Sequence, residues 1–294
     1  MKELVICSGK GGTGKTSVTA ALAALTENRV LVDADVDAAD LHLVVGPRPY
    51  QEGVFEGGHE AVIRQTDCDA CGLCYDLCRF DSITKNSSTG TDVFKIDPVR
   101  CEGCGVCVHS CPSEAIDFPV SVSGKWFISD TRHGPLVHAR LNPGAENSGK
   151  LVTLVREKGR ELAMDGKFDL MLVDGPPGIG CPVTAAITNA DMVLAVTEPG
   201  VSGHHDLMRL LDLAGTFQVP VAVCINKADI NLELTRKIQE ESLQKGAWLV
   251  GEIPFDTAIT EAQIHGRSVV ERGPSKASDA LVEVWKKTKS LLYR

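Results

Sequence analysis

The sequence predicts an α/β protein in which helices cover both faces of a mostly parallel sheet, interrupted by a small inserted α+β domain. Two observations predict the sheet: short apolar runs recur along the chain, and helical patterns separate most of them. A third predicts the insertion: eight cysteines lie between residues 68 and 111, in two runs of identical spacing. We therefore assign residues 1–63 and 120–294 to the core and 64–119 to the insertion.

The expected elements follow from runs of Val, Leu, Ile and Ala and from apolar residues that recur at helical spacing. The strands are expected at 4–6, 30–32, 170–173, 192–196, 221–225 and 248–250. The helices are expected at 16–25, 149–164, 204–214, 232–244 and 278–292. Residues 85–92 are a predicted polar loop, and 125–140 are predicted to return to the sheet through a hairpin. The last helix is predicted to cap the sheet; the alternative is a membrane-surface helix.

Composition excludes several classes of protein. The chain has 294 residues and a formal net charge of -9, which argues against nonspecific binding to nucleic acid or anionic lipid. No apolar run approaches the length of a membrane span. The chain passes from Met1 directly into a strand-like run, so we predict no signal peptide. Most cysteines have metal-ligand spacing rather than serving as secreted disulfides, and we therefore predict a cytoplasmic protein. The charge and the short apolar runs predict no nucleic-acid partner and argue against a membrane partner.

A glycine-rich loop lies between the first expected strand and the first expected helix. Residues 9–16 read G-K-G-G-T-G-K-T and satisfy the pattern G-x4-G-K-[ST]. Backbone N–H groups in such a loop hold phosphates, Lys15 would reach the β and γ phosphates, and the Thr16 hydroxyl would bind Mg²⁺. The alternative is a glycine-rich turn with a chance lysine. The predicted phosphate-binding residues are Gly9, Gly11, Gly12, Thr13, Gly14, Lys15, Thr16 and Ser17.

Lys10 makes this loop resemble the deviant Walker A loop of the MinD/ParA/Mrp ATPases, which are relatives of the nitrogenase iron protein. The resemblance implies a P-loop NTPase fold. It also implies that ATP binding closes a homodimer, or a heterodimer with a paralogue, in which Lys10 acts on the partner's nucleotide like an arginine finger. The alternative for Lys10 is a solvated loop charge.

Two further motifs carry the same resemblance. Residues 30–35 resemble the switch I strand with its D-x-D motif, which implies that Asp35 orients or activates water and that Asp33 lies near Mg²⁺. An acidic turn or helix cap is the alternative. Residues 172–178 resemble Walker B running into switch II, which implies that Asp174 holds Mg²⁺ through water and that Gly175 meets the γ-phosphate.

The nucleotide base has weaker signals. Asn226 and Lys227 follow an expected strand and resemble a base-reading N-K pair, with the Asn226 amide on adenine. Pro254 begins a stretch that resembles the loop lining the base. Together with Asp229, the pattern N-K-x-D also suits guanine, and the family resemblance favours ATP.

Each cysteine run is spaced C-x2-C-x2-C-x3-C, the pattern of two-cluster ferredoxins. In that pattern three thiolates wrap one face of a [4Fe–4S] cube and the fourth reaches the neighbouring cube. Zinc is the alternative, although zinc sites usually offer separated C-x2-C pairs. The resemblance implies that one cluster is held by Cys68, Cys71, Cys74 and Cys111 and the other by Cys101, Cys104, Cys107 and Cys78.

Three cysteines lie outside these runs. Cys7 and Cys224 lie in apolar strands and are predicted to pack in the core. Cys181 follows the Walker B motif, where cysteines of the nitrogenase iron protein clamp a bridging cube. Both a bridging cluster and a small residue at a helix start stay open for Cys181.

The combined resemblance is to MinD-like ATPases with an inserted ferredoxin domain, including ATPases of the orange-protein complex. It implies an Mg²⁺-dependent ATPase in which hydrolysis is coupled to electron transfer, or to iron–sulfur delivery, toward an unidentified partner protein. One alternative is a regulatory positioning ATPase whose clusters sense redox state. Another is a nucleotide-binding module with negligible turnover.

Overall fold

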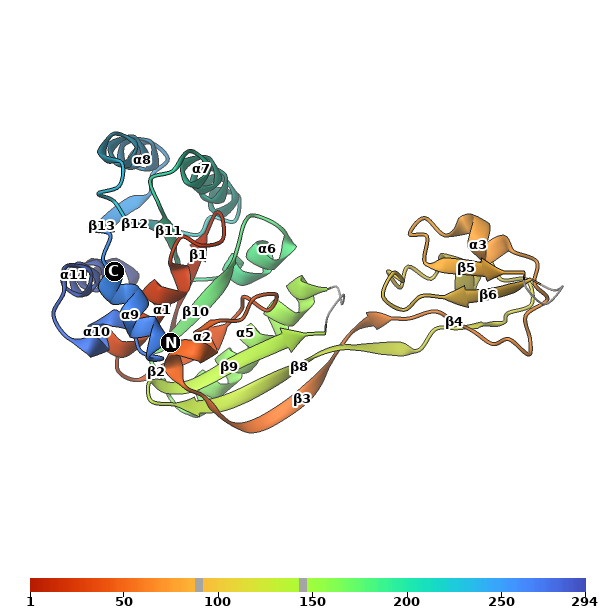
Figure 1. The fold of residues 1–294 in the computed structure, drawn as a ribbon. Coiled ribbons are helices and arrows are strands. Elements are labelled where there is room, and N and C mark those ends of the chain that lie inside the picture. The colour runs from red at the N-terminus through yellow and green to blue at the C-terminus, as the bar shows by residue number, and fades with distance from the viewer. Residues whose placement is uncertain (88–91, 143–146) are drawn as a thin grey trace. The chain divides into compact units, whose positions relative to one another are not determined.

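The computed structural model describes residues 1–87, 92–142 and 147–294 (Figure 1). The chain forms two compact units. The first, here the sheet unit, comprises Met1–Gly53, Trp126–Arg140 and Ser148–Arg294. The second, here the cysteine unit, comprises Val54–Lys125 and Leu141–Asn147, a wider range than the predicted insertion at 64–119. Each unit is described below by itself.

The sheet unit is built on parallel strands buried on both faces. Leu4 and Ile6 of β1 share a core with helix α1, whereas Val32 and Met171 lie against Gly159 of α5. This explains why the strands read as continuous apolar runs. The parallel strands are β1 (Lys2–Ser8), β2 (Arg29–Asp33), β9 (Gly134–Leu141), β10 (Leu170–Pro177), β11 (Met192–Thr197), β12 (Val221–Asn226) and β13 (Trp248–Ile253).

The strand order is β13-β12-β11-β1-β10-β2-β9-β8-β3. The predicted hairpin is confirmed: β8 (Val120–Thr131) turns into β9, and the Thr131 hydroxyl donates to the Gly134 carbonyl over 2.6 Å. The sequence did not predict β3 (Arg48–His59), which lies last in this order. The boundaries between the two units fall inside β3, β8 and β9.

Helices cover both faces of the sheet, as predicted (Figure 1). One layer contains α1 (Lys15–Leu25), α2 (Leu41–Val45), α9 (Thr257–Ile264), α10 (Val269–Arg272) and α11 (Lys276–Leu292). The other contains α5 (Ser148–Asp165), α6 (Cys181–Ile187), α7 (Val201–Thr216) and α8 (Leu232–Gln244). The apolar side of α11 packs on β13, which confirms the sheet-capping prediction. Among the described residues, no helix combines the length and the apolar character needed to cross a membrane.

The cysteine unit is small and shows the repeat of its sequence. Strands β4 (Val62–Ile63) and β7 (Ile116–Asp117) pair antiparallel, as do β5 (Ile83–Asn86) and β6 (Val93–Ile96). Helices α3 (Leu73–Leu77) and α4 (Val106–His109) each follow a left-handed glycine, Gly72 or Gly105. Of the predicted loop 85–92, residues 85 and 86 belong to β5, and residues 88–91 lie outside the described residues.

Candidate functional site

The glycine-rich loop joins β1 to α1 at the carboxyl edge of the parallel sheet. Gly14 caps α1 with a φ of 92°, and a side chain there would collide with the Asn226 amide. That amide donates to the Thr13 carbonyl over 2.8 Å, so Asn226 braces the loop from β12. The Thr13 hydroxyl is buried and has no hydrogen-bond partner among the described residues. The loop therefore presents a polar interior at the start of a helix, as a phosphate cradle requires.

Lys15 lies among carboxylates from two neighbouring strands. Its Nζ is 3.0 Å from Asp174 Oδ1 and 3.3 Å from Asp35 Oδ2, and Lys15 is 6% exposed. Burial alone would lower the pKa of Lys15, but the charges of Asp174 and Asp35 outweigh it and raise the pKa. Lys15 thus stays charged where the phosphates are predicted to lie.

Asp33 and Asp35 differ in their partners. Asp33 is fully buried, and its two oxygens accept the N–H groups of Asp35 (3.2 Å) and Leu41 (3.1 Å). Burial and the charge of Asp174 raise the pKa of Asp33 well above its ordinary value. Burial is also the main cause that raises the pKa of Asp35. Asp174 and Asp35 contact the Lys15 ammonium, and Asp33 is close enough for its charge to raise the pKa of Lys15. This acidic group could also receive a divalent cation.

The oxygen donors expected for Mg²⁺ lie together. The Thr16 hydroxyl donates to Asp174 Oδ2 over 2.8 Å, and the Thr19 hydroxyl donates to Asp174 Oδ1 over 2.7 Å. Hydroxyl and carboxylate oxygens are ligands that Mg²⁺ prefers, so these residues fit the cation. Thr19 was not predicted, although its position three residues after Thr16 on a helix places both on one face.

Lys10 is held within its own chain. Its Nζ is 2.8 Å from Glu198 Oε1 and 3.1 Å from the Ser202 hydroxyl, and Lys227 Nζ lies 2.8 Å from Glu198 Oε2. Burial would raise the pKa of Glu198, but hydrogen bonds and charges from both lysines lower it. Sequence reasoning missed Glu198. Glu198 comes directly after β11, and in a parallel sheet the residues at the carboxyl ends of the strands lie along one edge. This position could have marked Glu198 as a candidate site residue.

The remaining predicted residues, Ser17, Gly175 and Pro254, lie in different surroundings. Ser17 Oγ accepts from the Gln263 side chain over 2.8 Å, and Gly175 lies in buried backbone against Cys7 Sγ. Pro254 directly follows β13, and the next N–H, of Phe255, donates to Asp229 Oδ1 over 2.7 Å. The structure therefore brings the phosphate and Mg²⁺ candidates together. The roles of all these residues toward a nucleotide stay predictions.

In the cysteine unit, the eight cysteines of the repeat line two cavities. Each cavity takes three cysteines from one run and the fourth from the other. The empty space, counting the open mouths, is about 310 Å³ for the first and about 340 Å³ for the second. The first is lined by Cys68, Cys71, Cys74 and Cys111, and the second by Cys101, Cys104, Cys107 and Cys78.

Both exchanged cysteines take part in hydrogen bonds. Cys78 Sγ is 3.1 Å from the Ser82 hydroxyl, and the Ala115 N–H donates to Cys111 Sγ over 3.3 Å. Burial would raise the pKa of both thiols, but these and further backbone hydrogen bonds lower it. In contrast, burial raises the pKa of Cys74 to about 11. In the described part of the chain, no three His, Cys, Asp or Glu side chains are placed to hold one metal ion.

The other cysteines lie in the sheet unit. Cys7 and Cys224 are fully buried, and burial raises the pKa of each thiol to about 12, which confirms core packing. Cys181 is exposed at the first position of α6. The structure of one chain therefore leaves the bridging-cluster hypothesis as a prediction.

Comparison with known proteins agrees with the geometry of the glycine-rich loop. The model of the CobQ/CobB/MinD/ParA nucleotide-binding domain matches residues 4–269. The chain belongs to this family. An uncharacterized protein of Methanocaldococcus jannaschii is 30% identical over 99% of this chain and 97% of its own length.

Two other family relatives have names that describe a role. The septum site-determining protein MinD of Bacillus subtilis is 24% identical over 95% of this chain and 85% of its own. An iron-sulfur cluster carrier protein of Pyrococcus furiosus is 24% identical over 97% and 84%. The structure of MinD with Mg-ADP from Pyrococcus horikoshii superposes with a TM-score of 0.59 at 19% identity, covering 99% of this chain and 96% of that one. This last likeness supports the P-loop fold.

Proposed function

We propose that this family member is an Mg²⁺-dependent ATPase that carries two [4Fe–4S] clusters. In this proposal, ATP-driven dimerisation is coupled to electron transfer or to iron–sulfur delivery toward a partner protein. The observation that carries it is the exchange of one cysteine between the two runs. Cys111 joins the first three cysteines and Cys78 joins the second three, each set around its own cavity.

A cube suits these cavities for a geometric reason. Four thiols that share one zinc ion each lie about 2.3 Å from it, so their sulfurs converge on a point. A [4Fe–4S] cube has four irons, each bound by one cysteine, so its ligands surround a volume. The cysteines of the repeat line two cavities, four cysteines to each, which is the number of ligands that a cube takes. The name of the Pyrococcus furiosus relative adds support for iron–sulfur chemistry.

In the proposed nucleotide site, Lys15 holds the phosphates, and Thr16 and Asp174 hold Mg²⁺, which would neutralise charge on the phosphates. Asp35 orients the attacking water and accepts its proton. Its raised pKa suits this task, because a stronger base takes the proton more readily. Lys10 must leave Glu198 before it can reach a partner's nucleotide. We therefore expect dimerisation to exchange the Lys10–Glu198 ion pair for a contact with phosphate.

The cluster half of the proposal is tested by anaerobic purification, with iron and acid-labile sulfide counted per chain. We expect four of each per cluster and two clusters per chain. Cys107→Ala is expected to lose one cluster, and Cys181→Ala, at an exposed cysteine outside both cavities, serves as the control. Zinc in place of iron would refute this half. A loss of iron in Cys181→Ala would instead support the bridging-cluster hypothesis.

The ATPase half is tested with Asp35→Asn and with Asp37→Asn at an exposed neighbouring position. Asp35→Asn is expected to lower the hydrolysis rate about a hundredfold while ATP binding is retained, as is typical for loss of a general base. Asp37→Asn should hydrolyse at the normal rate. Rates are also measured with oxidised and reduced clusters. A rate that ignores cluster state contradicts coupling, and no hydrolysis in the unaltered chain supports a binding module.

A further inference from the structure

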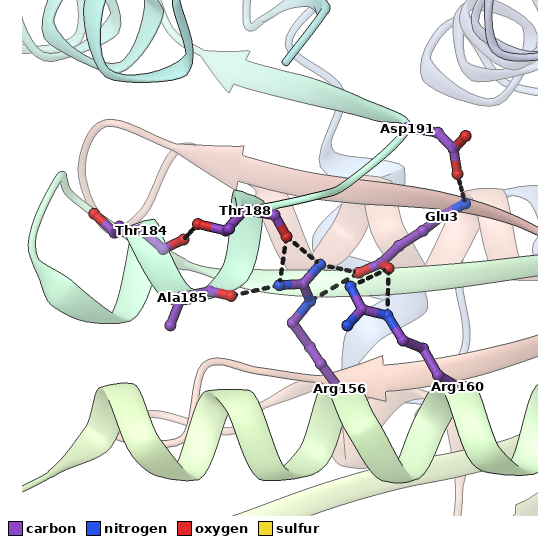
Figure 2. Close-up of polar contacts among 7 residues, drawn as sticks. All are labelled: Glu3, Arg156, Arg160, Thr184, Ala185, Thr188 and Asp191. Atoms are coloured by element: carbon purple, nitrogen blue, oxygen red, sulfur yellow. Dashed lines mark hydrogen bonds and ion pairs between the residues drawn. The ribbon is translucent and has the colours of Figure 1, made fainter. Parts of the chain in front are cut away.

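A buried group of charges lies near the start of β1, away from the glycine-rich loop that follows the end of the same strand. Glu3 and Arg156 are each only 3% exposed. Figure 2 shows that their charged groups face one another. Glu3 lies six residues before Gly9, which is about 20 Å along an extended strand. The group therefore lies outside the nucleotide site, and none of its members has a role in the proposed function.

The Arg156 guanidinium of α5 joins three elements. Its Nε donates to Glu3 Oε1 on β1 over 2.7 Å, and Nη2 bonds the same oxygen. Nη1 and Nη2 each donate to the Thr188 carbonyl over 3.1 Å, and Nη1 also donates to the Ala185 carbonyl (Figure 2). Arg160 donates to the other oxygen of Glu3 over 2.7 Å. Both oxygens of Glu3 and all three nitrogens of Arg156 are therefore engaged.

The two carbonyls belong to the C-terminal end of α6. The last carbonyls of a helix have no partner within the helix, and a cation at this end is favoured by the helix dipole. A shift of this end of α6 would remove the carbonyls from Arg156 and leave a buried guanidinium partly unsatisfied. The hydrogen bonds of Arg156 therefore hold the end of α6 to β1 and α5.

Among the described residues, the N-terminal end of α6 forms no hydrogen bond to a charged side chain, although the Gly178 N–H before it donates to the Ser8 carbonyl over 2.9 Å. This end follows the segment that leaves Asp174, where Gly178 has a φ of 93° and Gly180 and Cys181 are exposed.

Val183, Ala186 and Ile187 are all fully buried, so one side of α6 packs in the core along its length. What distinguishes the two ends is that the C-terminal end is bonded to Arg156 and the N-terminal end follows the partly exposed segment after Asp174.

We propose that Arg156 is a positioning residue that anchors the C-terminal end of α6, so that nucleotide-dependent movement is confined to its N-terminal end. Glu3 fixes the guanidinium and balances its charge. The inference rests on the proposed function in one respect, since it assumes that ATP binding moves the segment after Asp174. The anchor itself is a property of the chain without nucleotide, and the two parts can be tested separately.

The test uses the double substitution Glu3→Leu with Arg156→Met. Replacing a buried ion pair with apolar side chains of similar volume often preserves stability, so this variant is expected to fold while it loses the bonds to α6. Arg160→Gln is the matched control, because Arg160 contacts Glu3 and, within the part of the chain that the structure describes, forms no hydrogen bond to α6. Tryptophan fluorescence reports whether each variant is folded.

The measurement is amide hydrogen exchange of residues 178–188, with and without Mg²⁺ and a non-hydrolysable ATP analogue. In the unaltered chain, the Thr188 N–H, which donates to the Thr184 carbonyl over 3.1 Å, should exchange slowly and ignore the nucleotide. In the double variant its exchange should rise about tenfold or more and become sensitive to nucleotide, as loss of hydrogen bonds to a charged group predicts. Arg160→Gln should behave like the unaltered chain.

Unchanged exchange at 184–188 in the folded double variant would overturn the anchor. If that variant does not fold, Arg156→Lys replaces it, because lysine keeps the ion pair with Glu3 but lacks the planar set of N–H groups. Arg156→Lys should raise exchange in the same peptide, and no change would again refute the proposal. Failure of the unaltered chain to bind ATP defeats the proposed function and the nucleotide-dependent part, while exchange without nucleotide still decides the anchor.

Discussion

In the sheet unit, side chains such as Leu4, Leu22 and Leu172 are completely buried in a core that joins strands and helices from both halves of the sequence. The buried core of the cysteine unit contains Ala61, Ile63, Ile83, Phe94 and Ile116, and most of the partly buried side chains packed against it are cysteines. Helices α3 and α4 bury none of their residues. Small domains with so little core usually need a metal or a disulfide.

The largest test of this difference removes the iron of the proposed clusters from the anaerobically purified protein with a chelator. Because metal-binding free energy is folding free energy in such domains, amide exchange in β4 and β7 should accelerate at least about a hundredfold. The sheet unit should stay folded, and Trp126, Trp248 and Trp285, the only tryptophans of the chain, all lie in it and report this by fluorescence. Unchanged amide exchange in the cysteine unit after loss of iron would show that this unit, like the sheet unit, is stable without metal.

The next test concerns backbone strain in the cysteine unit. Gly103 has a φ of 59°, and a side chain there would collide with the backbone oxygen of His59. Gly103→Ala is therefore expected to lower the free energy of unfolding of the cysteine unit by about 1–3 kcal/mol. Denaturant titration followed by the absorbance of the proposed clusters measures this, with tryptophan fluorescence as the internal control. Equal shifts of the two signals would contradict independent stability of the two units.

A smaller effect is expected in the sheet unit, where the charge of Glu271 should make the free energy of unfolding depend on pH. Burial alone would raise the pKa of Glu271, but hydrogen bonds from Arg132 and the Ser268 N–H lower it to about 2. Since the folded pKa is below the unfolded value of 4.5, the stabilisation is full above pH 4.5 and is lost as pH falls toward 2. Glu271→Gln should lower the free energy of unfolding by about 1–2 kcal/mol at pH 7, after discounting for partial exposure.

The difference between Glu271→Gln and the unaltered chain should shrink as pH falls below 4.5. Glu283→Gln is the control, because Glu283 forms an exposed pair with Lys286 and should change stability by less than about 0.5 kcal/mol. Denaturation followed by tryptophan fluorescence isolates the sheet unit. A difference that persists unchanged to pH 3 would show that Glu271 stabilises the fold by something other than its charge.

The smallest effect is expected at Ala70, which occupies the repeat position equivalent to Gly103. Ala70 has a φ of 58°, a left-handed conformation that alanine tolerates poorly. Ala70→Gly removes this strain and adds backbone freedom to the unfolded chain, so we expect a net gain of about 0.5 kcal/mol. The same cluster-absorbance titration measures it. A loss of stability would show that the Ala70 methyl group contributes more to the fold than its left-handed backbone costs.

Local patterns were enough to predict most of the fold. Continuous apolar runs predicted the buried parallel strands, and α8 has the predicted bounds, because burial on both faces and helical spacing leave clear signatures. Strand β3 has no such signature: its residues are mostly exposed and include Pro49, Gly53, Gly57 and Gly58. Its place is set by pairing with β8, far along the chain, which local patterns do not encode.

The candidate site divides in the same way. Spacing alone placed Lys15, Thr16 and the cysteines, because each motif fixes its own geometry. Glu198 and the Glu3–Arg156 pair were not predicted. Their roles depend on contacts between residues far apart in sequence, 153 positions for Glu3 and Arg156. A single acidic residue after a strand could contact many different side chains, and only the folded structure shows which of them it meets.

Gly53 and Trp126 show how the fold accommodates its insertion. Gly53 is the last residue of the sheet unit before the cysteine unit, and Trp126 is the first after it. They lie so close on the neighbouring strands β3 and β8 that any side chain on Gly53 would strike the indole ring. The chain therefore leaves the sheet unit at Gly53 and re-enters it at Trp126, on the neighbouring strand. Residues 54–125 can be inserted between these two points without changing the order of the strands in the sheet. A short hairpin turn could be grafted in their place.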